Sequence, residues 1–302
     1  MSKYLNMAQS EALRVRWISV QCYEMILPNG KVIVTDPFYW DGNNYEALPM
    51  LTEEQKQEYK VYAQKGFSAD QFTGANYILI SHVHGDHCNL TGKLWRKFHG
   101  RVLVPAGAAE EIARVYNIPY GAIMPLYPGN TYYMDDFTLT VYPGAHDNRL
   151  FREGIFLQPN DPVHQDHGSM AFGIACPNKL SSLGTIFCLN FLIETQQNYR
   201  IDFSAGRDYI DHVRHVKDKA PNLMLRHRIR TVPPQEYARQ MEAMGAQLMM
   251  PLHHNNARAS DEDLNHYFEE VNHALQADGY CGVAFNPEPY RWYRIFSGIA
   301  GI

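Results

Sequence analysis

The chain lacks the sequence motifs of several common enzyme classes. Its 302 residues contain no G-x-S-x-G nucleophile motif, no P-loop and no G-x-G-x-x-G dinucleotide motif. These patterns normally mark serine hydrolases, P-loop nucleotidases and Rossmann oxidoreductases. Any chemistry must therefore be carried by a different arrangement of residues.

Long apolar runs and paired cysteines are also missing. No apolar stretch approaches the roughly 18 residues of a membrane-spanning helix. The first 17 residues show no apolar core of a signal peptide. The cysteines are odd in number, and none forms a C-x-x-C pair: Cys22, Cys88, Cys176, Cys188 and Cys281. We therefore expect a cytoplasmic protein with reduced thiols and no membrane association.

The chain also has no excess of positive charge. Its 27 Lys and Arg against 32 Asp and Glu give a net charge of −5. A nucleic-acid partner is therefore not expected. A hydrophobic content of 45% and the absence of a Gly-, Pro- or Ser-rich linker predict one globular domain over residues 1–302. Whether it forms a homo-oligomer is left open.

Apolar and polar residues alternate in blocks that predict a mixed α/β fold. Two strands joined at Pro28-Asn29-Gly30 are expected within residues 13–39, because this tripeptide favours a hairpin turn. Further strands are expected in residues 77–81, 100–107, 136–144, 169–176, 185–195, 199–206 and 246–252. Helices are expected in residues 52–66, 108–118, 233–245 and 261–277. This order predicts two sheets inside and helices outside.

The segment "ILISHVHGDHCN", residues 78–89, concentrates ionisable side chains behind an apolar strand. His82, His84, Asp86 and His87 would repel one another when protonated, and burial without a partner would be costly. A cation removes both problems, since imidazole and carboxylate are ligands for zinc, manganese or iron. The alternative, a structural cluster, is much less compatible with this spacing. Two further histidines, His146 and His253, follow strand-like segments and can converge on the same site.

The motif "SHVHGDH" resembles the H-x-H-x-D-H signature of the metallo-β-lactamase superfamily. The order of "VIVTDPF", "YILISHVHGDH", "VYPGAHD" and "MMPLHHN" is also similar. Within that superfamily, "CLNFLIET", "FSAGRDY" and "MMPLHHN" most resemble the L-ascorbate-6-phosphate lactonase-like metal-dependent hydrolases. The resemblance implies a four-layer αββα sandwich with a metal site at one edge of its sheets.

The resemblance also implies the ligand sets. His82, His84 and His146 would form one metal site, and Asp86, His87 and His253 a second. His254 is an adjacent candidate, although neighbouring strand residues point apart. Asp36 matches an aspartate near the site, with a supporting or structural role.

The chain departs from the family pattern after the strand at residues 199–206. The family usually has an aspartate after Ala-Gly that bridges two metals, but Arg207 occupies that position here. Asp208 comes one residue late and would point elsewhere unless the loop is remodelled. The sequence therefore leaves open whether one or two ions bind, with Asp208 as a further candidate ligand.

Hydrolysis by metal-bound hydroxide is the first functional hypothesis, with Asp86 positioning the water or passing its proton. Arg226, Arg228 and Arg230 share one side of an extended segment. They are either a solvated basic face or, with Arg207 and His254, part of a site for a small anionic metabolite. A lactone or ester of a sugar phosphate is the expected substrate. The alternatives are a phosphodiesterase or nuclease, or a diverged non-hydrolytic member acting in metabolite biosynthesis.

Overall fold

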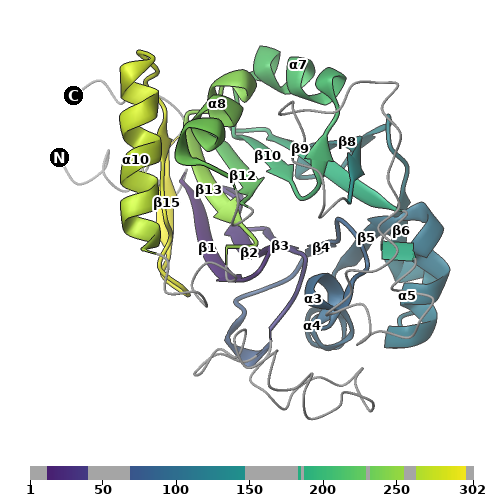
Figure 1. Ribbon diagram of the computed structural model, residues 1–302. Helices are drawn as coiled ribbons and strands as arrows, with labels where there is room; N and C mark the ends of the chain where they lie inside the picture. The colour runs from purple at the N-terminus through teal and green to yellow at the C-terminus, as the bar shows by residue number, and fades with distance from the viewer. Residues whose placement is uncertain are drawn as a thin grey trace, which may run out of the picture.

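Two β-sheets stacked between helices form the architecture of the chain, which Figure 1 shows as a ribbon diagram of the computed structural model. The structure describes residues 12–39, 69–146, 183–184, 187–228, 232–254 and 263–296. The expected helix at 52–66 and the expected strand at 169–176 lie outside these ranges. Of the helices within them, none is long and apolar enough to cross a membrane.

The first sheet contains the N-terminal strands and has the order β15-β1-β2-β3-β4-β5-β6. Its strands are β1 (Leu13–Ser19), β2 (Cys22–Ile26), β3 (Val32–Thr35), β4 (Tyr77–Leu79), β5 (Arg101–Pro105), β6 (Ile123–Leu126) and β15 (Tyr293–Ile295). Strands β3 to β6 are parallel to one another. Their carboxyl ends therefore lie at one edge of the sheet.

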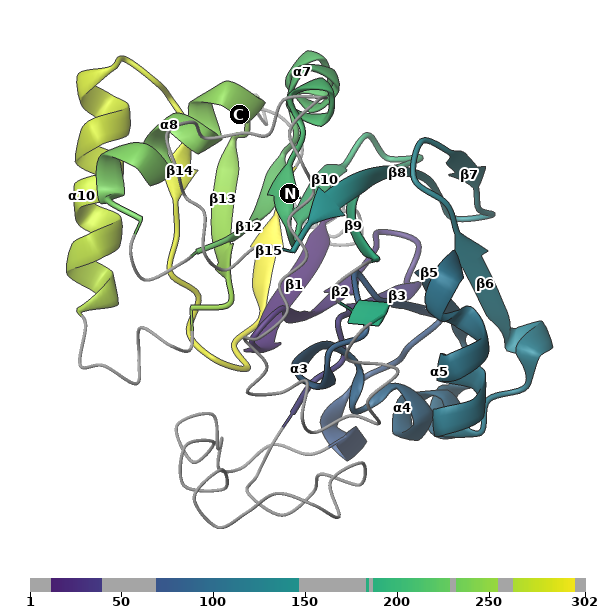
Figure 2. The same ribbon diagram turned by 45° about the vertical axis from the view of Figure 1, so that its right-hand side comes forward.

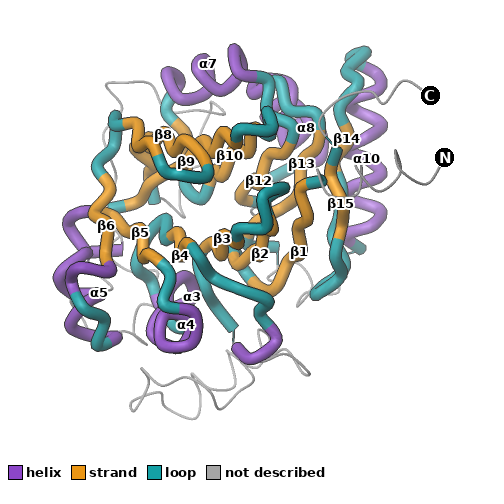
Figure 3. Tube along the Cα trace, turned by 180° about the vertical axis from the view of Figure 1, so that it is seen from behind, coloured by secondary structure: helices purple, strands orange, loops and turns teal. Residues whose placement is uncertain are grey.

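The second sheet has the order β11-β8-β9-β10-β12-β13-β14, and β7 pairs with β8. Its strands are β7 (Thr131–Tyr133), β8 (Phe137–Ala145), β9 (Cys188–Thr195), β10 (Arg200–Ser204), β11 (Arg207–Asp208), β12 (Leu223–His227), β13 (Leu248–Leu252) and β14 (Val283–Ala284). Strands β10, β12, β13 and β14 are parallel. In Figure 3, the strands of both sheets lie between the outer helices.

Three groups of buried side chains explain the layers. Leu13 and Trp17 of β1 and Phe191 of β9 belong to a core between the two sheets. The helices are α3 (Gly85–Cys88), α4 (Thr91–Phe98), α5 (Ala109–Tyr116), α7 (Ile210–Lys219), α8 (Pro234–Met244) and α10 (Leu264–Ala277), with 3-10 turns at Ala69–Gln71, Ala106–Ala108 and Tyr120–Ala122. A second core packs the outer face of the first sheet against α4 and α5, and a third packs the second sheet against α7, α8 and α10 (Figure 2). This is the α–β–β–α layering that the sequence predicts.

The N-terminal segment contains one more strand than the sequence analysis expected. The turn after Leu27 forms as predicted, with Gly30 at φ +85°. A second turn separates β1 from β2, with Val20 at φ +46°. A β-branched residue rarely adopts this conformation, so no local signal marked the turn. Tertiary contacts stabilise it instead, since the Val20 carbonyl accepts from the Trp17 indole and the His253 amide.

Candidate metal centre

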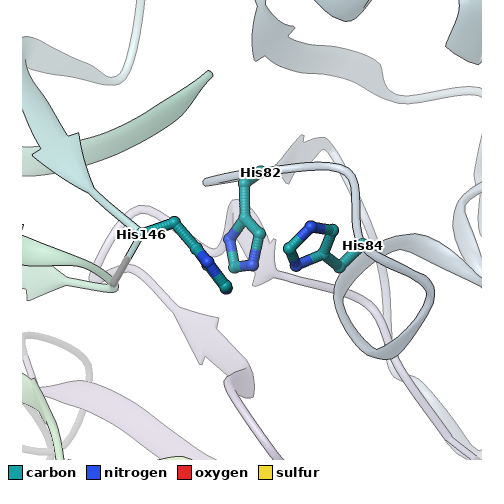
Figure 4. A group of neighbouring side chains, drawn as sticks. All are labelled: His82, His84 and His146. Atoms are coloured by element: carbon teal, nitrogen blue, oxygen red, sulfur yellow. The ribbon is translucent and has the colours of Figure 1, made fainter. Parts of the chain in front are cut away.

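Three histidines converge at the edge where strands of both sheets end. His82 and His84 follow β4, and His146 follows β8. In Figure 4, the His146 ring approaches from one part of the backbone, and the rings of His82 and His84 approach from another. The ring centroids lie 4.8 Å apart for His82–His84, 5.0 Å for His82–His146 and 4.5 Å for His84–His146. One nitrogen from each ring lies within 4.8 Å of the others, so the three can bind one ion.

A second set of ligand atoms lies beside the first. Asp86 and His87 are on the single-turn helix α3, and His253 follows β13. One ligand atom from each again lies within 4.8 Å of the others. His87 Nε2 is 3.4 Å from Asp86 Oδ1, and His253 Nε2 is 3.2 Å from Asp86 Oδ2. The structure therefore brings together all six residues that the resemblance assigns to the two sites.

Asp36 and Ser81 orient the ligand histidines. Asp36 Oδ1 accepts from the Ser81 amide at 2.6 Å, and Asp36 Oδ2 accepts from the Ser81 hydroxyl at 2.6 Å and lies 2.8 Å from His87 Nδ1. The Ser81 hydroxyl has only one hydrogen to donate, so it accepts from His82 Nδ1, 2.9 Å away. His82 then carries its proton on Nδ1, and Nε2 presents a lone pair. Asp36 thus has the supporting role expected from the sequence, whereas Ser81 was not foreseen.

Two residues at the site adopt left-handed backbone conformations. Asp36 has φ +35° and His253 has φ +57°, values that are uncommon for residues other than glycine. Asp36 is anchored by its carboxylate contacts, and the His253 amide donates to the Val20 carbonyl at 2.9 Å. Such strain persists only where the surrounding structure holds the residue in place. Here it turns both side chains toward the cluster.

The ionisable residues of the cluster differ in the direction in which their surroundings shift the pKa. Burial, together with the neighbouring histidines, lowers the pKa of His82 well below its usual value, so this ring is neutral at neutral pH. Burial alone would lower the pKa of His87, but Asp86 and Asp36 raise it to about 10. Burial would raise the pKa of Asp86, yet His87 and His253 hold it well below its usual range. His87 must therefore lose a proton before it can bind an ion through Nε2.

Strand β11 places Arg207 and Asp208 on opposite sides of the second sheet. Asp208 Oδ1 accepts from Asn190 Nδ2 at 2.6 Å and lies 3.0 Å from His212 Nδ1. Its other oxygen forms an ion pair with Arg226. These contacts face the helix layer, and Asp208 belongs to neither ligand set among the described residues. The interpretation of Asp208 as the missing metal ligand is therefore corrected, because its carboxylate is held on the other face of the sheet.

The two described arginines of the run, Arg226 and Arg228, pack under helices rather than at the cluster. Arg226 and Arg228 are each 2% exposed, so a solvated basic face is wrong for these two residues. Arg226 Nε donates to Gln240 on α8 at 2.7 Å, and the Arg228 guanidinium stacks 4.1 Å from the centroid of the Tyr267 ring. The shared side predicted for them is the face that α8 and α10 cover. Arg230 lies outside the described residues. A substrate-binding role for the run stays a prediction that these positions do not support.

Three other positions complete the description of the site. His254 is buried and stacks on Trp17, with ring centroids 4.1 Å apart, so it points away from its neighbour His253. His227, at the end of β12, faces His253 at 5.0 Å, and burial and this neighbour lower its pKa well below the usual value. Gly184 packs on His84 so closely that an added Cβ would lie 2.3 Å from Cδ2 of that ring. Because side chains alternate along a strand, His227 is expected on the face opposite Arg226, so the sequence could have identified it as a residue near the site. No sequence signal marked Gly184.

The donor atoms at this edge fit a divalent metal. His82 Nε2 is buried and has no hydrogen-bond partner among the residues that the structure describes. Such an atom costs free energy unless something binds it. The tautomer set by Ser81 gives it a lone pair, and two more imidazoles lie beside it. Neutral imidazoles with a nearby carboxylate are suitable ligands for zinc, manganese or iron.

Solved structures share this architecture at low sequence identity. Igni18, a metallo hydrolase from Ignicoccus hospitalis, is similar with a TM-score of 0.61 and 12% identity, over 95% of this chain and 100% of that chain. YhfI, a metallo-β-lactamase fold protein from Bacillus subtilis, is similar with a TM-score of 0.52 and 11% identity, over 94% of this chain and 99% of that chain. CmlA, a diiron β-hydroxylase from Streptomyces venezuelae, gives a TM-score of 0.54 and 14% identity, over 94% of this chain and 54% of that chain.

The comparisons establish the fold. Searches against protein-family models and against curated protein sequences find no match. The structural similarity, together with the two sheets between helices, shows that the chain has the metallo-β-lactamase fold, an αββα sandwich. This confirms the fold predicted from "SHVHGDH" and its flanking strands. The narrower resemblance to lactonase-like hydrolases stays a prediction.

Proposed function

We propose that the protein is a metal-dependent hydrolase of small anionic substrates. The observation that carries this proposal is the buried Nε2 atom of His82, which has no hydrogen-bond partner among the described residues and lies beside His84 and His146. This set would hold a divalent ion. When bound, the ion would lower the pKa of a water molecule and polarise the bond under attack. Zinc and manganese are the first candidates, and iron is compatible.

Asp86 is the proposed catalytic residue. It is 5% exposed and lies between His87 and His253, which keep its pKa well below the usual range. An ionised carboxylate at this position can orient a water molecule and accept its proton. Asp36 and Ser81 hold the neighbouring histidine rings, so the carboxylate works within a fixed frame.

Arg207 is the arginine best placed to recognise an anionic group. Its strand, β11, pairs with the end of β8, where Arg207 lies opposite Ala145, the residue before His146. Its 9% exposure keeps the guanidinium out of bulk water, which strengthens a charge-assisted hydrogen bond. A lactone or ester of a sugar phosphate, or of a related metabolite, is the proposed substrate class.

Hydrolysis by the reloaded protein tests the proposal. The protein is stripped with a chelator, reloaded with zinc or manganese, and assayed with phosphorylated and unphosphorylated lactones, p-nitrophenyl esters and bis(p-nitrophenyl) phosphate. We expect metal-dependent opening of a phosphorylated lactone. Asp86→Asn should lower kcat by on the order of a hundredfold while the metal is retained. Asp211→Asn, at an exposed carboxylate, is the control.

Turnover that survives both metal removal and Asp86→Asn would contradict the proposal. Selective cleavage of bis(p-nitrophenyl) phosphate would instead favour a phosphodiesterase.

A non-hydrolytic reaction in metabolite biosynthesis is the second candidate. Two observations favour it: Arg207 stands at the sheet edge where the family pattern has a carboxylate, and the fold is similar to that of a diiron β-hydroxylase. Tight iron binding without hydrolysis of any probe, whichever metal is loaded, would favour this candidate over the first.

A further inference from the structure

The two ligand sets at the sheet edge differ in what already occupies their donor atoms. In the set of His82, His84 and His146, the buried His82 Nε2 has no hydrogen-bond partner among the described residues. In the other set, Asp86 Oδ2 is 3.2 Å from His253 Nε2 and Asp86 Oδ1 is 3.4 Å from His87 Nε2. An ion entering the second set must break these internal contacts, whereas one entering the first breaks none at His82.

A carboxylate able to contact an ion in each set would strengthen the second site and offset this difference in occupied donor atoms. Strand β11 does not supply such a carboxylate. Asn190, His212 and Arg226 hold Asp208 on the face of the sheet that carries the helices. Alternation along the strand then places Arg207 on the opposite face, next to Ala145 in the register. The residue that β11 brings to the side of the cluster is therefore a cation.

The ligand charges reinforce the asymmetry. The first set contributes three imidazoles, and the second contributes one carboxylate, Asp86. Two divalent ions held side by side would place four positive charges against the carboxylate of Asp86 and that of Asp36, which lies behind His87, with Arg207 as a further cation on β11. With one divalent ion, the excess of positive charge at the site is far smaller. The Asp86 carboxylate also lies close enough to the first ligand set to attract that ion.

We propose that the protein binds one divalent ion tightly at His82, His84 and His146, while Asp86, His87 and His253 form a weak second site, because Arg207 stands where a shared carboxylate would be needed. The inference rests on the proposed metal-dependent function and specifies its cofactor stoichiometry. In a one-metal enzyme of this kind, Asp86 is free to act on water and substrate.

Zinc titration of the chelator-treated protein, followed by calorimetry and elemental analysis, tests this inference. The natural protein should bind one equivalent tightly and a second about a hundredfold more weakly. His84→Ala should remove the tight equivalent, and His253→Ala should leave it in place. Circular dichroism of each variant checks that it is folded.

Substitutions at position 207 separate ligand chemistry from charge. Arg207→Asp should tighten the second equivalent by at least about tenfold, because it both supplies a carboxylate and removes a cation. Arg207→Gln, the matched control, removes only the cation and should tighten it less. If Arg207→Asp does not fold, the contrast between His84→Ala and His253→Ala still decides the matter.

Three outcomes would overturn the inference: two equivalents of similar affinity in the natural protein, loss of the tight equivalent in His253→Ala with retention in His84→Ala, or a folded Arg207→Asp whose second equivalent is unchanged. Failure of the proposed function has a different signature. Absence of any zinc binding would overturn both, whereas one tight equivalent without hydrolysis of any probe would overturn only the hydrolase assignment.

Discussion

Two buried groups of ionisable side chains, one under α7 and one at the edge of the two sheets, differ in the charges that meet within them. Under α7, the two ring nitrogens of His212 each lie 3.0 Å from a carboxylate oxygen, one of Asp202 and one of Asp208. Arg226 completes this network through its ion pair with Asp208. In the set of His82, His84 and His146 at the sheet edge, by contrast, three imidazoles face one another, and His82 Nε2 has no hydrogen-bond partner among the described residues.

The difference indicates different roles. A buried network whose acids and bases meet one another contains its own counter-charges, and it stabilises one arrangement of the chain. A buried cluster of like groups with an orphaned lone pair needs a cation. We therefore interpret the network under α7 as structural and the cluster at the edge as a metal centre.

The largest expected effect comes from breaking the network under α7. Arg226→Met should lower the free energy of unfolding by about 3–5 kcal/mol, because it leaves the Asp208 carboxylate buried without its cation. Urea denaturation measures the loss. Arg214→Met is the control, since Arg214 and Asp211 form an exposed pair worth roughly 0–1 kcal/mol. Zinc affinity of the folded Arg226→Met protein should stay unchanged; a stability loss no greater than that of the control would contradict the structural role.

An intermediate effect is expected from the hydroxyl that orients His82. Ser81→Ala removes the acceptor at His82 Nδ1 and should weaken zinc binding by about 10–100-fold. Ser204→Ala is a matched control in the other group, where the hydroxyl donates to Asp202 at 2.6 Å. That variant should lose stability but bind zinc normally. Competition with a chromophoric chelator measures both affinities, and equal zinc affinities in the two variants would refute the distinction between the groups.

The smallest expected effect comes from the glycine packed on His84. Gly184→Ala places a Cβ 2.3 Å from Cδ2 and 2.9 Å from Nε2 of that ring, so the ring must shift. We expect zinc affinity to fall by about tenfold, or roughly 1.4 kcal/mol. Gly121→Ala meets nothing within 4 Å and should change neither affinity nor stability appreciably. Unchanged affinity in Gly184→Ala would mean that this face of His84 is not constrained as the structure indicates.

The metal-centre residues could be predicted because their signal is local. The run from His82 to His87 has its ligand spacing within one short segment, and His146 and His253 each follow an apolar strand. The layers of the fold follow from the same apolar blocks, and α5, α8 and α10 formed where helical spacing predicted them.

The parts that could not be predicted depend on tertiary contacts. Strand alternation put Arg226 and Arg228 on one side, but only the packing of α8 and α10 determines that this side is buried. The turn at Val20 has no glycine or proline and is held by contacts from Trp17 and His253. Ser81 and Gly184 act through neighbours that fold against them, so their residue types carry no functional signal alone.

The position of the first bound ion tests the central claim most directly. Crystals of the chelator-treated protein, loaded with one equivalent of zinc, would give an anomalous difference map at the zinc edge. The account predicts a single strong peak among His82, His84 and His146, the set that contains the orphaned nitrogen. A peak among Asp86, His87 and His253 with none at the first set, or no peak at either set, would contradict it.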